Sequence, residues 1–65
     1  MSAMMLSLKC ARVMAGLTQK VAAAKIGVTR GTVCNWERGK TCPTVEQALK
    51  LSKVYRVDLD NIKFF

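Results

Sequence analysis

The stretch Thr18–Lys40, which reads TQKVAAAKIGVTRGTVCNWERGK, decides the fold of this chain. Thr18 can begin a helix, because its hydroxyl can accept a hydrogen bond from a free backbone N–H of the first turn. The residues that follow, up to Ile26, include neither proline nor glycine and are rich in alanine, which has the highest helix propensity. Gly27 can end this helix, since glycine readily adopts a positive φ.

A second short helix is predicted directly after this turn. Thr29 is another candidate N-cap, Arg30 to Arg38 can form the helix, and Gly39 can end it. Two helices joined by a turn of about three to four residues that contains glycine are typical of a helix-turn-helix motif. From these two helices alone, an ordinary αα-hairpin within a helical bundle is an equally good interpretation.

The rest of the chain is predicted to be helical as well, and no strand is predicted. We expect helices at residues 4–15, 18–26, 29–38, 44–55 and 60–63, so the fold class is all-α, a compact bundle of five short helices. At 65 residues the chain is predicted to be one domain, residues 1–65, near the lower size limit for folding unaided. The two terminal phenylalanines, Phe64 and Phe65, could form a short edge strand, fold back on the core or form an exposed patch.

The apolar faces of these helices follow from their periodicity. The expected inward residues of the first helix are Met4, Leu8, Ala11, Arg12 and Ala15. Those of the fourth helix are Val45, Ala48, Leu49, Ser52 and Tyr55. The fourth helix begins with a capping box, T-V-E-Q, from Thr44 to Gln47. Ile62 is expected to point inward from a last helix capped by Asp58 or Asp60.

An arginine on an inward face needs a carboxylate partner, because an unpaired buried charge is expensive. The chain has only four acidic residues, and Glu37 is the candidate partner of Arg12.

The charge balance is strongly basic. Eleven lysines and arginines against four acidic residues give a net charge of +7, and the isoelectric point is about 9.9. Such a balance is typical of nucleic-acid-binding domains, although basic surfaces also serve solubility. We favour nucleic acid over an anionic membrane as the partner, and no apolar run reaches the ~18 residues of a membrane span.

Other classes of function find little support in the sequence. Cys10, Cys34 and Cys42 form no CxxC pair and the chain has no histidine, so we expect no metal site. We expect the three thiols to be reduced, as is usual in the cytoplasm. The chain has no nucleophile motif and no glycine-rich phosphate loop, and its carboxylates are scattered. We therefore expect no enzyme, no cofactor and no small-molecule ligand.

The helix predicted at 29–38 has two distinct faces on a wheel of about 100° per residue. One arc holds Arg30, Gly31, Cys34, Asn35 and Arg38, whereas Val33 and Trp36 lie opposite. Arginine pairs with guanine and asparagine with adenine in the major groove, and a small residue allows close approach. A solvated helix face would look partly similar, but it would more often carry glutamate and lysine.

These features give two sets of predicted DNA contacts. The residues predicted to read bases are Thr29, Arg30, Gly31, Cys34 and Asn35. The residues predicted to contact phosphates are Gln19, Thr32, Arg38, Lys40 and Thr41. Gln19 stands at the first turn of a helix, where free N–H groups favour an anion, although N-terminal capping is its alternative role.

The pattern L-T-Q-x3-A-x3-G-V-T-x3-V-x2-W-E-x-G-x3-P, from Leu17 to Pro43, resembles the lambda-repressor-like (Xre-like) helix-turn-helix family of phage repressors and Cro proteins. The resemblance covers about residues 5–63. It implies that the helix beginning near Thr29 enters the major groove and that Gln19 binds a phosphate. It also implies a structural salt bridge between Arg12 and Glu37, which agrees with the pairing expected from the scarcity of acidic residues.

The chain departs from the family pattern at three positions. Val21 replaces an acidic residue and is expected to be exposed, Ala22 replaces a leucine of the core, and Arg56 replaces the glycine that usually ends the fourth helix. Arg56 is therefore expected to adopt a positive φ. These departures bear on stability more than on function.

The resemblance implies a sequence-specific, double-stranded-DNA-binding regulator of transcription in the cytoplasm of a bacterial or phage-infected cell. The short chain favours a Cro-like phage or prophage repressor that binds an operator as a homodimer through its C-terminal region. A restriction–modification controller, an antitoxin-type regulator and a protein-interaction module that uses the same fold remain alternatives.

Overall fold

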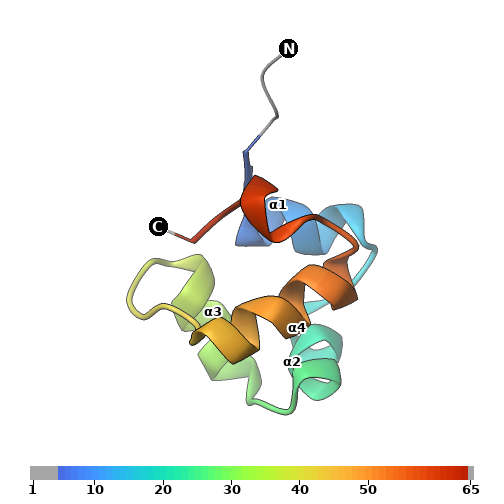
Figure 1. Ribbon diagram of the computed structural model, residues 1–65. Helices are drawn as coiled ribbons and strands as arrows, with labels where there is room; N and C mark the ends of the chain where they lie inside the picture. The colour runs from blue at the N-terminus through green and yellow to red at the C-terminus, as the bar shows by residue number, and fades with distance from the viewer. Residues whose placement is uncertain (1–4, 65) are drawn as a thin grey trace.

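The computed structural model describes residues 5–64, and within them the chain is mostly helical (Figure 1). The elements in chain order are β1 (Leu6–Ser7), α1 (Leu8–Met14), α2 (Gln19–Ile26), α3 (Arg30–Glu37), α4 (Val45–Tyr55), a 3-10 helix (Leu59–Asn61) and β2 (Ile62–Lys63). Helices α2 and α3 form the two arms of the helix-turn-helix and pack against each other, and α4 packs against α2. The motif predicted from Thr18–Lys40 is therefore present.

Each of the four α-helices begins with a hydroxyl side chain that accepts from a backbone N–H. Their N-caps are Ser7, Thr18, Thr29 and Thr44. At α4 the capping box is complete, because the Thr44 hydroxyl accepts from Gln47 N at 3.2 Å and the Gln47 side chain accepts from Thr44 N at 2.9 Å. The caps read from the sequence at residues 18, 29 and 44 are confirmed.

Two left-handed residues end helices where the sequence predicted them. Gly27 follows α2 with φ of 88°, and its N–H donates to the carbonyl of Ala23 at 2.8 Å. Arg56 follows α4 with φ of 56°, and among residues 5–64 no other non-glycine residue has a positive φ. The arginine that replaces the usual glycine is thus held in a strained backbone conformation.

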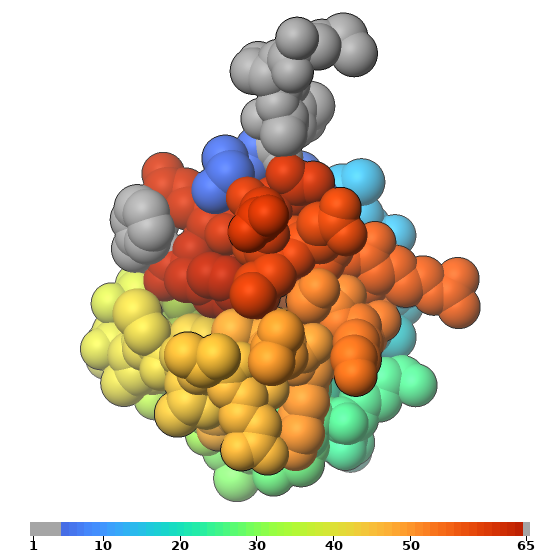
Figure 2. All heavy atoms as spheres, viewed as in Figure 1, coloured from blue at the N-terminus to red at the C-terminus, as the bar shows by residue number. Residues whose placement is uncertain are grey.

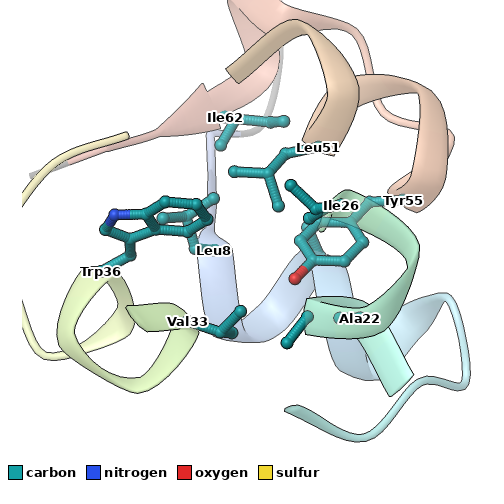
Figure 3. Close-up of a cluster of buried hydrophobic side chains, with 10 residues drawn as sticks. Leu8, Ala22, Ile26, Val33, Trp36, Leu51, Tyr55 and Ile62 are labelled. Atoms are coloured by element: carbon teal, nitrogen blue, oxygen red, sulfur yellow. The ribbon is translucent and has the colours of Figure 1, made fainter. Parts of the chain in front are cut away.

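The core lies where the four helices meet, and Figure 3 shows its main side chains. They are Leu8 from α1, Ala22 and Ile26 from α2, Val33 and Trp36 from α3, Leu51 and Tyr55 from α4, and Ile62 from β2. Leu51 and Val33 are the largest fully buried side chains. Burying this apolar surface fixes α3 against the rest of the molecule.

The predicted first helix, residues 4–15, is too long. Helix α1 begins at Leu8, because Ser7 caps it and Leu6–Ser7 form β1 instead. Its predicted inward residues Leu8, Ala11 and Arg12 are buried, whereas Met4 lies outside the described residues.

The prediction of a fifth α-helix at residues 60–63 is also wrong. A 3-10 helix at Leu59–Asn61 is followed by β2, and the Asp58 side chain makes no capping hydrogen bond. Strand β2 pairs with β1 in parallel, so a small strand pair modifies the predicted all-α fold. A strand of two residues has no periodicity to reveal it in the sequence. Phe64 packs against the core, and Phe65 lies outside the described residues.

The predicted inward face of α4 is correct only in part. Ala48 and Tyr55 are buried and Ser52 is half-buried, but Val45 is 76% exposed and Leu49 is 48% exposed. Leu51, which the prediction left out, is fully buried. The apolar stripe could be centred on either side of Ala48, and only packing against α2 and the 3-10 helix selected the side that contains Leu51.

Candidate nucleic-acid interface

Helix α3 separates its two faces as the helical wheel predicted. Val33 and Trp36 are 1% and 5% exposed and anchor the helix in the core. On the other side Arg30, Gly31 and Arg38 are exposed, and Cys34 and Asn35 are half-buried. The structure therefore brings the predicted arc of α3 together on one accessible surface.

The N-terminus of α3 is ordered by two threonines. The Thr29 hydroxyl accepts from Thr32 N at 3.2 Å, and the two hydroxyl oxygens lie 2.9 Å apart. Thr29 is exposed and Thr32 is half-buried, so both hydroxyls lie at the start of the exposed face. The Thr29 hydroxyl caps the helix, and only one of the two hydroxyl hydrogens is used between them, so the other remains available to donate to another partner.

The loop after α3 turns back onto the end of the helix. Gly39 adopts φ of 76°, and the backbone N–H of Lys40 donates to the carbonyl of Asn35 at 3.0 Å. The side chains of Arg38, Lys40 and Thr41 are exposed around this turn. The predicted phosphate contacts of the loop thus lie beside the C-terminal end of α3.

The fold does not require a glycine at position 31. A Cβ atom placed there would meet one neighbour, the Thr29 hydroxyl oxygen at 3.8 Å, which is an ordinary contact, and its φ is not in the left-handed region. Glycine in a helix is less favourable than alanine by up to about 1 kcal/mol. No contact within the described residues therefore requires glycine at this position.

The predicted salt bridge between Arg12 and Glu37 is confirmed. Arg12 Nε lies 2.7 Å from Glu37 Oε2, and the two side chains are 11% and 4% exposed. Arg12 also donates from Nη2 to Glu37 Oε1 at 3.4 Å and from Nη1 to the carbonyl of Leu17 at 2.8 Å. The pair therefore joins α1, the residue before the α2 N-cap, and the end of α3.

Gln19 makes a contact that the sequence did not predict. Its side-chain Nε2 donates to Glu37 Oε1 at 3.0 Å. The two residues are 18 positions apart and belong to different helices, so no local spacing could indicate the bond. Gln19 is half-buried and remains accessible on one side.

An open depression lies between the starts of α2 and α3. It has a volume of about 370 Å³ and is lined by Arg12, Leu17, Thr18, Gln19, Lys20 and Arg30. Three of these six residues are cations, and no acidic residue lines it. The depression brings Gln19 and Arg30, which the sequence placed in different roles, to one basic surface.

Tyr55 lies in the electrostatic field of the same salt bridge. The pKa of its hydroxyl is raised to about 12, mainly by burial and also by the negative charge of Glu37, whereas the positive charge of Arg12 opposes the rise. Tyr55 is therefore protonated throughout the neutral range, and it fills the core between α2 and α3 as an uncharged group (Figure 3).

The described residues hold no group of three or more potential metal ligands among histidine, cysteine, aspartate and glutamate. Cys10 and Cys42 are exposed and Cys34 is half-buried, and all three thiols are free. Within residues 5–64, no helix has both the length and the apolar character needed to cross a membrane.

Comparison with known proteins gives a family match over most of the chain. The model of a helix-turn-helix family matches residues 8–62. The HTH-type transcriptional regulator ImmR of Bacillus subtilis is 43% identical over 53 residues, which are 82% of this chain and 42% of ImmR. The chain therefore spans about two fifths of the length of ImmR.

Two archaeal proteins, both described as uncharacterized HTH-type transcriptional regulators, are similar over most of their own lengths. The one from Methanocaldococcus jannaschii is 38% identical over 55 residues, which are 85% of this chain and 83% of that protein. The one from Archaeoglobus fulgidus is 34% identical over 50 residues, which are 77% of this chain and 71% of that protein. No solved structure matches.

Proposed function

The chain belongs to the lambda-repressor-like helix-turn-helix family of DNA-binding transcriptional regulators, which are not enzymes, and from this membership we propose that it binds a specific operator sequence in double-stranded DNA. One observation carries the proposal. The accessible face of α3 presents Arg30, Gly31 and Asn35, and the only acidic side chain of α3, that of Glu37, is buried in a salt bridge. No negative charge on α3 therefore opposes its approach to phosphates.

Helix α3 is the reading element of this proposal. Arg30 donates hydrogen bonds to a guanine, and Asn35 forms a hydrogen-bonded pair with an adenine. Gly31 allows the helix backbone to approach the floor of the groove. Thr29 and Cys34 contact neighbouring base edges from the same accessible side. The burial of Val33 and Trp36 supports this arrangement, because it sets the rotation of α3 about its own axis.

Phosphate contacts flank the reading helix on both sides. Arg38, Lys40 and Thr41 bind the DNA backbone from the loop after α3, and Gln19 binds it from the start of α2, with Thr32 between them. The basic depression beside Gln19 supports this role, since the free N–H groups and the positive end of α2 favour an anion there.

We further propose that the chain acts as a homodimer, in the manner of a small Cro-like phage or prophage repressor, on DNA in the cytoplasm. One recognition helix reads only a few base pairs, so two subunits spaced by a helical turn are needed for a specific operator. The C-terminal region supplies the contact between subunits. Val57, Leu59 and Phe64 are apolar and only half-buried there, which supports a role in association.

Selection of bound sequences from a pool of random duplex DNA tests the proposal. We expect recovery of a palindromic site, and sedimentation should show a dimer at the concentrations that bind it. If the dimer neutralises ~10 phosphates, the plot of log affinity against log salt concentration should have a slope near −9. Recovery of no motif would instead favour a protein-interaction module built on the same fold.

A further inference from the structure

We propose that Glu37 is a positioning residue for DNA binding, which holds the side-chain amide of Gln19 in the place from which it contacts a phosphate. The inference rests on the DNA-binding function proposed above. It goes beyond that function, because the family resemblance gives Glu37 only the structural role of neutralising Arg12.

The contacts of the Glu37 carboxylate carry the inference. Its Oε2 accepts from Arg12 Nε at 2.7 Å, and its Oε1 accepts from Gln19 Nε2 at 3.0 Å. Glu37 is the last residue of α3 and Gln19 is the first residue of α2. One carboxylate therefore ties the C-terminal end of the reading helix to the N-terminal end of the helix that faces the phosphate.

Arg12 extends this connection to the backbone. Its Nη1 donates to the carbonyl of Leu17 at 2.8 Å, directly before the N-cap Thr18 of α2. The start of α2 is thus held twice, once through the backbone before its cap and once through the side chain of its first residue. Both connections end on the same buried ion pair.

Burial makes the arrangement specific. The Glu37 side chain is 4% exposed, so water has little access to the carboxylate. The Gln19 amide must turn its nitrogen toward Glu37, because its oxygen in that place would repel the carboxylate. An amide nitrogen carries two hydrogens, and Gln19 donates one of them in its hydrogen bond to Glu37. The second hydrogen remains for an acceptor on the accessible side, where Lys20 and Arg30 line the basic depression with Gln19.

A purely structural role of the ion pair makes a different prediction from a positioning role. Buried ion pairs can often be replaced by apolar side chains of similar volume without loss of stability. A chain with Arg12→Met and Glu37→Leu therefore keeps its core filled and loses both the acceptor of Gln19 and the donor to Leu17. A structural role predicts unchanged DNA affinity for this double variant, and a positioning role predicts weaker binding.

The experiment measures affinity for the selected operator, with stability followed separately by the fluorescence of the buried Trp36. We expect the double variant to melt near the wild type and to bind roughly 3- to 10-fold more weakly, the value of one hydrogen bond. Gln19→Ala should weaken binding by a similar factor. Adding Gln19→Ala to the double variant should cost nothing further, since the amide is then already out of place.

A second pair of variants is used if the double variant does not fold. Glu37→Asp, alone and with Gln19→Ala, is measured below the unfolding temperature, with Glu46→Asp as the control. Glu37→Asp keeps the negative charge opposite Arg12 but shortens the side chain by one methylene, so we expect the carboxylate to lose its contact with Gln19. Glu46→Asp makes the same change at an exposed position of α4, and it should leave the effect of Gln19→Ala unchanged. Non-additivity with Glu37→Asp and additivity with Glu46→Asp support the proposal.

Three results distinguish a failure of the positioning role of Glu37 from a failure of the proposed DNA binding. Wild-type affinity of the double variant, or additive losses with Gln19→Ala, would overturn the positioning role. Wild-type affinity of Gln19→Ala alone would also overturn it, while DNA binding itself would stand. If the wild-type chain bound no duplex specifically, the proposed function would fail first.

Discussion

Leu6 and Ile62 are paired across a two-stranded parallel ladder, although they are 56 positions apart in the chain. Their segments lie side by side at one end of the molecule, with α1 beside them (Figure 1). The space-filling view shows the C-terminal segment lying over the body of the molecule next to the N-terminal one (Figure 2). The pairing places Ile62, which is 3% exposed, in the same core as Trp36.

Ile62→Ala should therefore strongly destabilise the fold, even though the residue is close to the C-terminal end. We expect a loss of about 2–5 kcal/mol in the free energy of unfolding, because the change leaves a cavity in the core. Denaturant unfolding followed by Trp36 fluorescence measures the loss. The neighbouring Lys63→Ala is the control and should change stability by less than about 0.5 kcal/mol, since Lys63 is exposed. Equal effects of the two changes would contradict the role of Ile62 in the core.

Gly31→Ala should separate stability from DNA binding. The added methyl meets only an ordinary contact at 3.8 Å, so we expect the variant to be more stable by about 0.5–1 kcal/mol. The same methyl stands on the accessible face of α3, where it should weaken operator binding. Thermal unfolding and a DNA titration of the same preparation measure the two effects. Unchanged operator affinity of the Gly31→Ala variant would show that Gly31 does not lie at the DNA interface.

Arg30→Ala and Lys40→Ala should weaken DNA binding in different ways. Arg30 is proposed to read a base, so its loss should relax the preference for the operator over random duplex, by about 1–3 kcal/mol at that base pair. Lys40 is proposed to contact a phosphate, so its loss should weaken binding to all sequences alike. A competition titration with operator and random duplexes measures both. Equal loss on the two duplexes for Arg30→Ala would rule out base reading by this residue.

The pKa of Tyr55 predicts how stability changes at alkaline pH. The pKa is about 12 in the folded chain against an ordinary value near 10, so the unfolded chain releases this proton first. The stabilising effect is complete below about pH 10 and is lost as the pH rises through about 12. The free energy of unfolding of the wild type should therefore fall across this range more steeply than that of Tyr55→Phe.

Comparison of the two chains isolates this effect from the titration of lysines and cysteines. Tyr55 is the only tyrosine, so absorbance of the phenolate follows its ionisation directly. Identical slopes of the two chains between pH 10 and 12 would contradict the raised pKa.

Arg56→Gly should stabilise the fold. Arg56 has φ of 56°, and a left-handed residue with a Cβ costs roughly 1–2 kcal/mol. Part of this gain is offset by the larger entropy of glycine in the unfolded chain, so we expect a net increase of about 0.5–1 kcal/mol. Arg56→Ala is the matched control and should show no such gain, because alanine keeps the Cβ. A melting temperature unchanged by the glycine would show that the backbone is not strained there.

Local chemistry in the sequence determined much of the motif. The hydroxyl N-caps at Thr18, Thr29 and Thr44 and the left-handed Gly27 act within one or two turns of the chain, so residue types reveal them directly. The positive φ of Arg56 was predicted from its position at the end of a helix, where the family pattern has glycine. The two faces of α3 also follow from spacing alone, because a regular helix fixes the direction of every side chain.

Packing between distant segments decided the rest. The burial of Leu51 and the exposure of Leu49 depended on where α4 packs against α2. The parallel pairing of Leu6 with Ile62 depended on the N-terminal and C-terminal segments being brought together by the fold. The hydrogen bond from Gln19 to Glu37 forms only after α2 and α3 have packed. The sequence by itself therefore determined helix α3 and its accessible face. Only the tertiary structure decided how this helix is tied to the start of α2, because that contact joins residues which no local periodicity relates.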